Sequence, residues 1–274
     1  MLTLVVALPA EAQPLCEHFG LTKVSTPGDV AMFESEQLRL IQTGVGTVAA
    51  ASAVGYVAGR YAAQQTLAWL NVGIAGHRSL PVGTACLGYK VTDAATNRSW
   101  YPPVTFESAC ANTTIRTVTE ASNDYPHECA YDMEAAGFCA AASRFSTSEL
   151  VHCLKIISDN PTEPSHRVTS ALVRELLSAQ LPSISSVVAT LSEIRAELAT
   201  INADPPAFPL LCERFRFTHT ERNQLRRLLT QHAALAPDTD LTVMLNTQGS
   251  GKQVLLVLKD QVGALALAFA GPNT

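Results

Sequence analysis

Three acidic residues lie where an apolar, strand-like run meets a helical pattern. Glu11 follows the run "LTLVVAL", Glu134 opens a helical pattern in "YDMEAAGF", and Asp159 ends the apolar run "HCLKIIS". Carboxyl groups at the ends of neighbouring strands can converge on one pocket, where a pair of them can act as general acid and base. Each also has a plainer interpretation. Glu11 and Glu134 would favour a helix N-terminus through its dipole, and Asp159 could cap a helix.

The elements that would position these acids follow from the hydrophobic pattern. Strands are predicted for the apolar runs at 2–8, 38–44, 67–73, 84–94, 114–119 and 152–158. Helices are predicted between or after them at 10–19, 47–64, 132–145, 165–179 and 186–200. Several runs are apolar on both faces, which is typical of a central sheet covered by helices. The alternation predicts an α/β fold whose ligand binds at the carboxyl ends of the strands.

The composition narrows the class of protein. Hydrophobic residues make up 47% of the 274 residues and charged residues 16%, which is typical of an ordered globular chain. The formal net charge of -5 would attract neither nucleic acid nor an anionic membrane, so a small neutral or cationic ligand is expected. The opening "LTLVVAL" lacks a basic region and is too short to span a membrane, which predicts a first buried strand in a cytoplasmic protein. Seven cysteines without a C-x-x-C pair favour reduced thiols over a zinc site or disulfides.

The sequence changes character at "NADPPAFPLL", residues 202–211, where three prolines predict a linker rather than a helix. We therefore predict one domain at 1–202 and a small α+β appendage at 203–274. The appendage is expected to contain a helix near 218–236, with Thr220 as its N-cap, followed by a β-meander. The predicted strands of this meander are "LTVMLN" (241–246), "QVLLVLK" (253–259) and "ALALAFA" (264–270).

Two features of the appendage could suggest phosphate binding. The stretch "QGSGKQ" lacks Ser or Thr after Lys252 and lacks the first glycine of a phosphate loop, so it is predicted to be a hairpin turn. A local basic cluster either forms a solvated helix face or contacts phosphates, and we favour the solvated face, without nucleic acid as a partner. The cluster consists of Arg214, Arg216, Arg222, Arg226 and Arg227.

Five motifs occur in an order that resembles the nucleoside phosphorylase superfamily, and within it the 5'-methylthioadenosine/S-adenosylhomocysteine nucleosidases. They are "ALPAEAQPL", "TGVGTVAAA", "NVGIAGH", "YDMEAAGF" and "KIISDN". The resemblance covers residues 1 to about 200 and rests mainly on "DMEAA" and "ISD". It implies a three-layer α/β domain with a central mixed sheet, usually assembled as a homodimer, that needs neither a cofactor nor a metal.

The resemblance also implies roles for the acids. Cleavage between ribose and a purine leaves a cation-like ribosyl group and an anionic base, so an acid must protonate the base while the nucleophile arrives from the opposite face. Asp159 matches the acid at N7 of the purine, Glu11 the group that activates water, and Glu134 the carboxylate that holds the ribose hydroxyls. Met133 matches the residue packed beneath the sugar. The further substrate-binding positions implied by the resemblance are Leu8, Gly73, Ile74, Ala75, Gly76 and Lys155. Asp132 is predicted instead to lie at a helix N-terminus, where negative charge is favoured.

The choice between hydrolysis and phosphorolysis depends on arginines that hold phosphate. The phosphorylase branch carries one in a Gly-Asp-Pro-type loop near the N-terminus and one before a "GSCG"-like turn. Here the loop is "LPAEAQP", and Asn71 precedes "VGIAG". Since both arginines are missing, we predict a hydrolase. A phosphate-dependent phosphorylase and a non-catalytic nucleoside-binding protein are the alternatives.

The sequence departs from the nucleosidase pattern at three places. Ile74 replaces the usual serine, and Lys155 replaces the usual arginine before "ISD", which retains the charge without the planar fork. The chain between "VTDA" and "YDMEAA" is shorter than usual. The aromatic residue that stacks on the purine is therefore unassigned, with Trp100, Tyr101, Phe106 and Tyr125 as candidates. The segment "TNRSWYPP" (96–103) is either a cover for the pocket, as we expect, or an ordinary surface loop.

Overall fold

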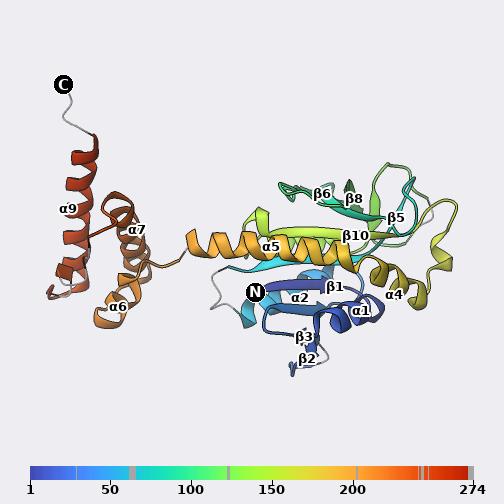
Figure 1. Ribbon diagram of the computed structural model, residues 1–274, viewed down its shortest axis with the longest axis horizontal. Helices are drawn as coiled ribbons and strands as arrows, with labels where there is room; N and C mark the ends of the chain where they lie inside the picture. Colours follow the sequence, from blue (N-terminus) through green and yellow to red (C-terminus); the bar gives the residue numbers. More distant parts are fainter. Residues whose placement is uncertain are drawn as a thin grey trace. The chain divides into compact units, whose positions relative to one another are not determined.

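The computed structural model divides the chain into two compact units (Figure 1). It describes residues 1–28, 30–61, 66–121, 124–201, 203–239, 241, 244–245 and 247–270. Unit 1 is Met1–Ile201 and unit 2 is Asn202–Thr274. The division adjoins the boundary expected from the proline-rich stretch, and it follows directly on the last helix of unit 1.

Within the described residues, the strands of unit 1 form one ten-stranded mixed sheet. They are β1 (Leu2–Val6), β2 (Thr22–Lys23), β3 (Ala31–Glu34), β4 (Leu38–Gln42), β5 (Ala68–His77), β6 (Ala85–Asp93), β7 (Ser99–Trp100), β8 (Ala111–Thr117), β9 (Ala130–Asp132) and β10 (Val151–Asp159). The six predicted runs correspond to β1, β4, β5, β6, β8 and β10. The other strands have two to four residues, too few for a hydrophobic period to show.

The strand order is β10-β6-β8-β9-β5-β1-β4-β3-β2, and β10 also pairs with β5. Strands β5, β10, β6, β8 and β9 therefore close into a ring. Closure depends on β5, whose first half pairs in parallel with β1 while Gly76 and His77 at its end pair antiparallel with β9. Because β1, β4, β5 and β10 are parallel, their carboxyl ends lie at one edge of the sheet. Strand β9 runs in the opposite direction to β5, which returns the chain after Asp132 to this edge.

Helices cover both faces of this sheet, as Figure 1 shows. They are α1 (Pro9–Phe19), α2 (Thr47–Arg60), α3 (Ala135–Ala142), α4 (Ser170–Ala179) and α5 (Leu181–Ile201). Neighbouring residues of one strand enter different cores: Leu4 packs with α1, α4 and α5, whereas Val5 packs with α2 and α3. This arrangement confirms the predicted three-layer α/β fold. The predicted end of the second helix, 62–64, lies outside the described residues.

Helices α2 and α3 approach each other closely at one glycine. A side chain at Gly137 would overlap the carbonyl oxygen of Thr47, the first residue of α2. The small residues of "MEAAGFCAAA" thus allow α3 to lie directly against α2. This contact fixes the position of Glu134, which precedes the first turn of α3.

Unit 2 is helical over its described residues, so the prediction of an α+β appendage was wrong. Its helices are α6 (Ala207–Arg214), α7 (His219–Leu235) and α9 (Gly251–Ala270). The predicted strands 253–259 and 264–270, and part of the predicted hairpin turn, belong to α9. Val254, Leu255 and Leu258 enter the core at helical spacing. A short apolar run does not by itself distinguish a strand from a buried helix. In the predicted strand 241–246, residues 242, 243 and 246 lie outside the description.

Two predictions about where helices begin in unit 2 were also wrong. Pro206 is the N-cap of α6 and Pro209 lies in its first turn, where a missing N–H group costs no helical hydrogen bond. The prolines therefore begin a helix rather than exclude one. The N-cap of α7 is Thr218, not Thr220, because its side chain accepts from the Glu221 N–H while Glu221 accepts from the Thr218 N–H.

All seven cysteines are free, and those at 86, 110, 129, 139 and 153 are buried. None of the helices in the described part of the chain combines the length and apolar character needed to cross a membrane. Within the same residues, no group of three or more His, Cys, Asp or Glu side chains is arranged to hold a metal ion.

Candidate active site

A cavity of about 530 Å³ lies where the carboxyl ends of β1, β5 and β10 meet the turn after β9. Its lining includes eight of the ten predicted catalytic and substrate-binding residues: Leu8, Glu11, Ile74, Ala75, Gly76, Met133, Glu134 and Asp159. The three acids are far apart in the chain but share this one cavity. Gly73 and Lys155 do not line it.

Glu11 lies in the first turn of α1, and its carboxyl group is held by backbone N–H groups from outside that helix. Its Oε2 accepts hydrogen bonds from the N–H groups of Ala7 and Leu8, each at 2.9 Å, and its Oε1 accepts from that of Ile74 at 3.0 Å. Burial raises the pKa of Glu11, whereas the backbone donors and the charge of Lys155 oppose that rise. The result is a fixed, buried carboxyl group facing the cavity.

Two other residues explain how this carboxyl group fits. A side chain at Gly73 would lie 2.9 Å from Glu11 Oε1, so the glycine leaves space for the acid without lining the cavity. Ile74 lacks the hydroxyl of the usual serine, but it still orients Glu11 through its backbone N–H. The substitution therefore changes the cavity surface and preserves the position of the acid.

Glu134 is the residue before α3, and its carboxyl group lies beside the start of α2. Its Oε1 accepts a hydrogen bond of 2.9 Å from the N–H of Gly46. Gly46 has a φ of 104°, which favours glycine, and this conformation aims its N–H toward α3. Burial raises the pKa of Glu134, and the charge of Lys155 opposes the rise.

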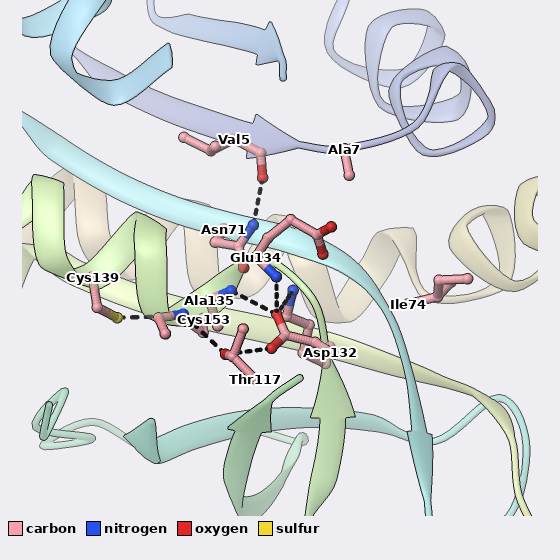
Figure 2. Close-up of polar contacts among 12 residues, drawn as sticks. Val5, Ala7, Asn71, Ile74, Thr117, Asp132, Glu134, Ala135, Cys139 and Cys153 are labelled. Carbon is pink, nitrogen blue, oxygen red and sulfur yellow. Dashed lines mark hydrogen bonds and ion pairs between the residues drawn. The ribbon is translucent and has the colours of Figure 1, made fainter. Parts of the chain in front are cut away.

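Asp132 lies beneath Glu134 in a buried network, shown in Figure 2. Its Oδ2 accepts from the backbone N–H of Ala135 at 2.7 Å and pairs with Lys155 Nζ at 2.8 Å, while Oδ1 accepts from the Thr117 hydroxyl at 2.7 Å. Asp132 therefore caps α3, as the sequence indicated. Burial by itself would lower the pKa of Lys155, but the charges of Asp132 and Glu134 raise it above its ordinary value.

Asp159 reaches the cavity through an irregularity at the end of β10. Ile157 pairs with Ala75 and Asp159 with the next residue, Gly76, so Ser158 is an extra residue in the pairing. Such a bulge redirects side chains, and here both Ser158 and Asp159 line the cavity. The carboxyl group accepts hydrogen bonds from the Ser158 hydroxyl at Oδ1 and from the Tyr125 hydroxyl at Oδ2.

The structure corrects the expected cover of the pocket. No residue of 96–103 lines the cavity; the lining instead takes residues from 116–126. Among the four candidate aromatics, Tyr125 lines the cavity, whereas Trp100 packs in the core beside α2 and α3. Tyr101 is exposed, and Phe106 packs against the ring of His152.

Sequence reasoning missed Arg116 and Tyr131, which also line the cavity. They pair across β8 and β9, so their side chains lie on the same face of the sheet. The alternation of side chains along a strand could have revealed them. Thr117 and Asp132 point toward α3, so the residue before each, Arg116 or Tyr131, points to the opposite face. Within the described part of the chain, Arg116 forms no hydrogen bond or ion pair.

No family model matches the sequence, and no curated protein does. A 5'-methylthioadenosine nucleosidase from Arabidopsis thaliana matches at a TM-score of 0.57 and 16% identity, covering 69% of this chain and 95% of that one. A 5'-methylthioadenosine/S-adenosylhomocysteine nucleosidase from S. pneumoniae, solved with a transition-state inhibitor, matches at 0.55 and 19%, covering 70% and 98%. Futalosine hydrolase from Helicobacter pylori matches at 0.55 and 14%, covering 69% and 97%.

Unit 1 has the nucleosidase fold. This confirms the fold implied by the five motifs, although the identities are low. In this nucleosidase fold the cavity lies between acids from separate elements: Glu11 from α1, Glu134 from the start of α3 and Asp159 from β10. The arrangement can bring an acid and a base to one bound molecule from different directions.

Proposed function

We propose that unit 1 hydrolyses the N-ribosidic bond of a purine nucleoside of the methylthioadenosine or adenosylhomocysteine type. The observation that carries this proposal is the single cavity shared by the buried carboxyl groups of Glu11, Glu134 and Asp159. The nucleosidase fold supports it. A cavity of about 530 Å³ has the size of an ordinary small-molecule site.

The proposed reaction uses Glu11 and Asp159 at opposite ends of the bond. Glu11 accepts a proton from a water molecule as the water oxygen bonds to C1' of the ribose. The bond from C1' to N9 of the purine breaks, and its electron pair passes to the base. Protonated Asp159 donates its proton to N7, so the base leaves neutral. Exchange with solvent then removes the proton from Glu11 and restores it to Asp159.

The remaining residues bind the sugar and orient the acids. Glu134 accepts hydrogen bonds from the ribose hydroxyls, and Met133 packs beneath the ring, since both line the cavity. Lys155 acts through Asp132, because its ammonium group is buried in that ion pair. A carboxylate with a raised pKa is a stronger base, so the burial of Glu11 suits the activation of water.

Phosphorolysis is less consistent with this cavity. Phosphate is a dianion that needs several cationic or backbone donors. Among the described lining residues, Arg116 is the one Lys or Arg, and five carboxyl groups surround the same space: Glu11, Asp124, Asp132, Glu134 and Asp159. Water is therefore the proposed nucleophile.

The test is release of free base from a panel of 5'-substituted adenosines, measured by chromatography with and without phosphate. We expect phosphate-independent release, and a loss of at least about 100-fold in kcat for Asp159→Asn and Glu11→Gln. Glu17→Gln is the matched control, because Glu17 is an exposed residue of α1 that contacts Gln13. Phosphate-dependent release with ribose-1-phosphate would establish a phosphorylase. Binding of adenine without turnover of any member would favour the non-catalytic alternative.

A homodimer is part of the same proposal. Val45 and Val48, at the start of α2, are apolar side chains that are 51% and 78% exposed, and Val45 also lines the cavity. A second copy packed on this region would cover them and border the site. Light scattering should give the mass of two chains for the wild type and of one for Val48→Asp. A wild-type monomer would contradict the assembly.

A further inference from the structure

Tyr125 contacts the acid of the proposed reaction directly. It lies between β8 and β9, is 5% exposed, and its hydroxyl donates to Asp159 Oδ2. Its ring meets that of Tyr131 edge-on, with centroids 5.4 Å apart. A side chain at Gly76 would lie 2.6 Å from Asp159 Oδ2 and 2.8 Å from the Tyr125 hydroxyl oxygen, so this contact requires glycine at that position.

We propose that Tyr125 is the positioning residue of Asp159, holding its carboxyl group toward the cavity and stabilising the negative charge that remains after the proton has passed to the base. This inference rests on the proposed nucleosidase activity. It assigns Tyr125 a polar role through its hydroxyl, distinct from the stacking role considered for its ring.

The chemistry follows from where the charge develops. When the proton bound to Asp159 transfers to N7, the carboxyl group becomes a buried carboxylate. The Ser158 hydroxyl donates to Oδ1 and the Tyr125 hydroxyl to Oδ2, so each oxygen already has a donor in place. Each carboxylate oxygen has two lone pairs, which leaves capacity for the N–H of the departing base. Donors fixed before the reaction stabilise developing charge without reorganisation.

Tyr125 keeps its own proton under ordinary conditions. Burial raises the pKa of its phenol, and both the hydrogen bond to Asp159 and the charge of Asp159 raise it further. The phenol is therefore a donor throughout the neutral range. The other titratable groups that line the cavity are Arg116 on β8, Asp124, Tyr131 and Asp132 on β9, Glu134 before α3 and Glu11 on α1.

Tyr125→Phe removes the hydroxyl and retains the ring. We expect kcat to fall about 10- to 100-fold, the effect of one hydrogen bond to a charged group, with KM within about twofold. Tyr89→Phe is the control, since Tyr89 is an exposed tyrosine of β6 that is not among the residues lining the cavity. An unchanged kcat in Tyr125→Phe would overturn the proposal.

A second measurement does not depend on turnover. Phenol ionisation is followed by ultraviolet absorption during alkaline titration of the full chain, in the wild type and in Asp159→Asn. We expect one tyrosine to ionise at lower pH in Asp159→Asn, and this change to disappear when Tyr125→Phe is added. Identical curves for the wild type and Asp159→Asn would overturn the contact. If the wild type released no base but the curves differed as expected, the nucleosidase proposal would fail while the pairing of Tyr125 with Asp159 stood.

Discussion

At the residue scale, Lys155 was predicted to bind the substrate but forms a buried ion pair in the structure. The resemblance assigned it to the substrate, because a cation precedes "ISD". In the structure it is fully buried and pairs with Asp132, which caps α3. Its influence on the cavity is therefore indirect: it holds the turn that carries Glu134. An ammonium group has no planar fork with which to reach several partners at once.

The first prediction concerns this ion pair. Lys155→Met would leave the charge of Asp132 buried without its partner, which typically costs about 3–5 kcal/mol. We expect the free energy of unfolding, measured with urea, to fall by this amount. Lys23→Met, at an exposed position of β2, should change it by less than about 0.5 kcal/mol. A loss in Lys155→Met no larger than in this control would show that the pair does not hold the turn.

A second prediction at this scale concerns pH. The pKa of Glu134 is raised in the folded protein from an ordinary value of 4.5, chiefly by burial, so the folded state binds the proton more tightly. Its contribution therefore makes the protein less stable as pH rises above about 4.5, by at most about 1.4 kcal/mol per pH unit. Glu134→Gln should therefore make the unfolding free energy fall less steeply as pH rises above about 4.5. Glu17→Gln should leave the slope unchanged, and an equal slope in both variants would contradict the assignment.

At the element scale, the site depends on how closely α2 and α3 pack. The N–H of Gly46, before α2, binds the carboxyl group of Glu134, before α3. The small residue Gly137 permits this approach. The glycine and alanines of "MEAAGFCAAA" are small enough for close packing, but the sequence does not identify α2 as the partner. Gly46 and Glu134 lie 88 positions apart in the chain, so no local sequence pattern reveals their contact.

The third prediction tests this packing. Gly137→Ala would force its new methyl group against the backbone of Thr47, which cannot move as a flexible side chain would. We expect a loss of about 1–3 kcal/mol in unfolding free energy and weaker binding of nucleoside. The matched control is Gly59→Ala in α2, where nothing lies within 4 Å of the new methyl group. That change should stabilise the helix by about 0.5–1 kcal/mol. Stabilisation by both changes would contradict the close contact.

At the scale of the whole molecule, the two units have separate cores. The clusters around Leu4 and Val5 belong to unit 1, and the cluster around Leu225 belongs to unit 2. All the residues that line the cavity lie in unit 1. Unit 2 therefore supplies none of the chemistry proposed here.

The fourth prediction follows from this separation. A chain ending at Ile201 should fold cooperatively, because both cores of the sheet remain complete. Its thermal unfolding transition and its release of base should match those of unit 1 within the full chain. Circular dichroism and the chromatographic assay measure the two properties. Loss of the cooperative transition on truncation would show that unit 1 requires unit 2.

The sequence by itself determined the layered α/β fold of unit 1 and the placement of Glu11, Glu134 and Asp159 at the ends of elements. Both follow from local periodicity, which reports the buried face of each segment, and from motifs that are contiguous in the chain. Only the tertiary structure decided that Lys155 pairs with Asp132 and that Tyr125 binds Asp159. It also decided that the apolar runs 253–259 and 264–270 of unit 2 form one helix, because burial against distant residues selects between conformations that a short apolar run allows equally.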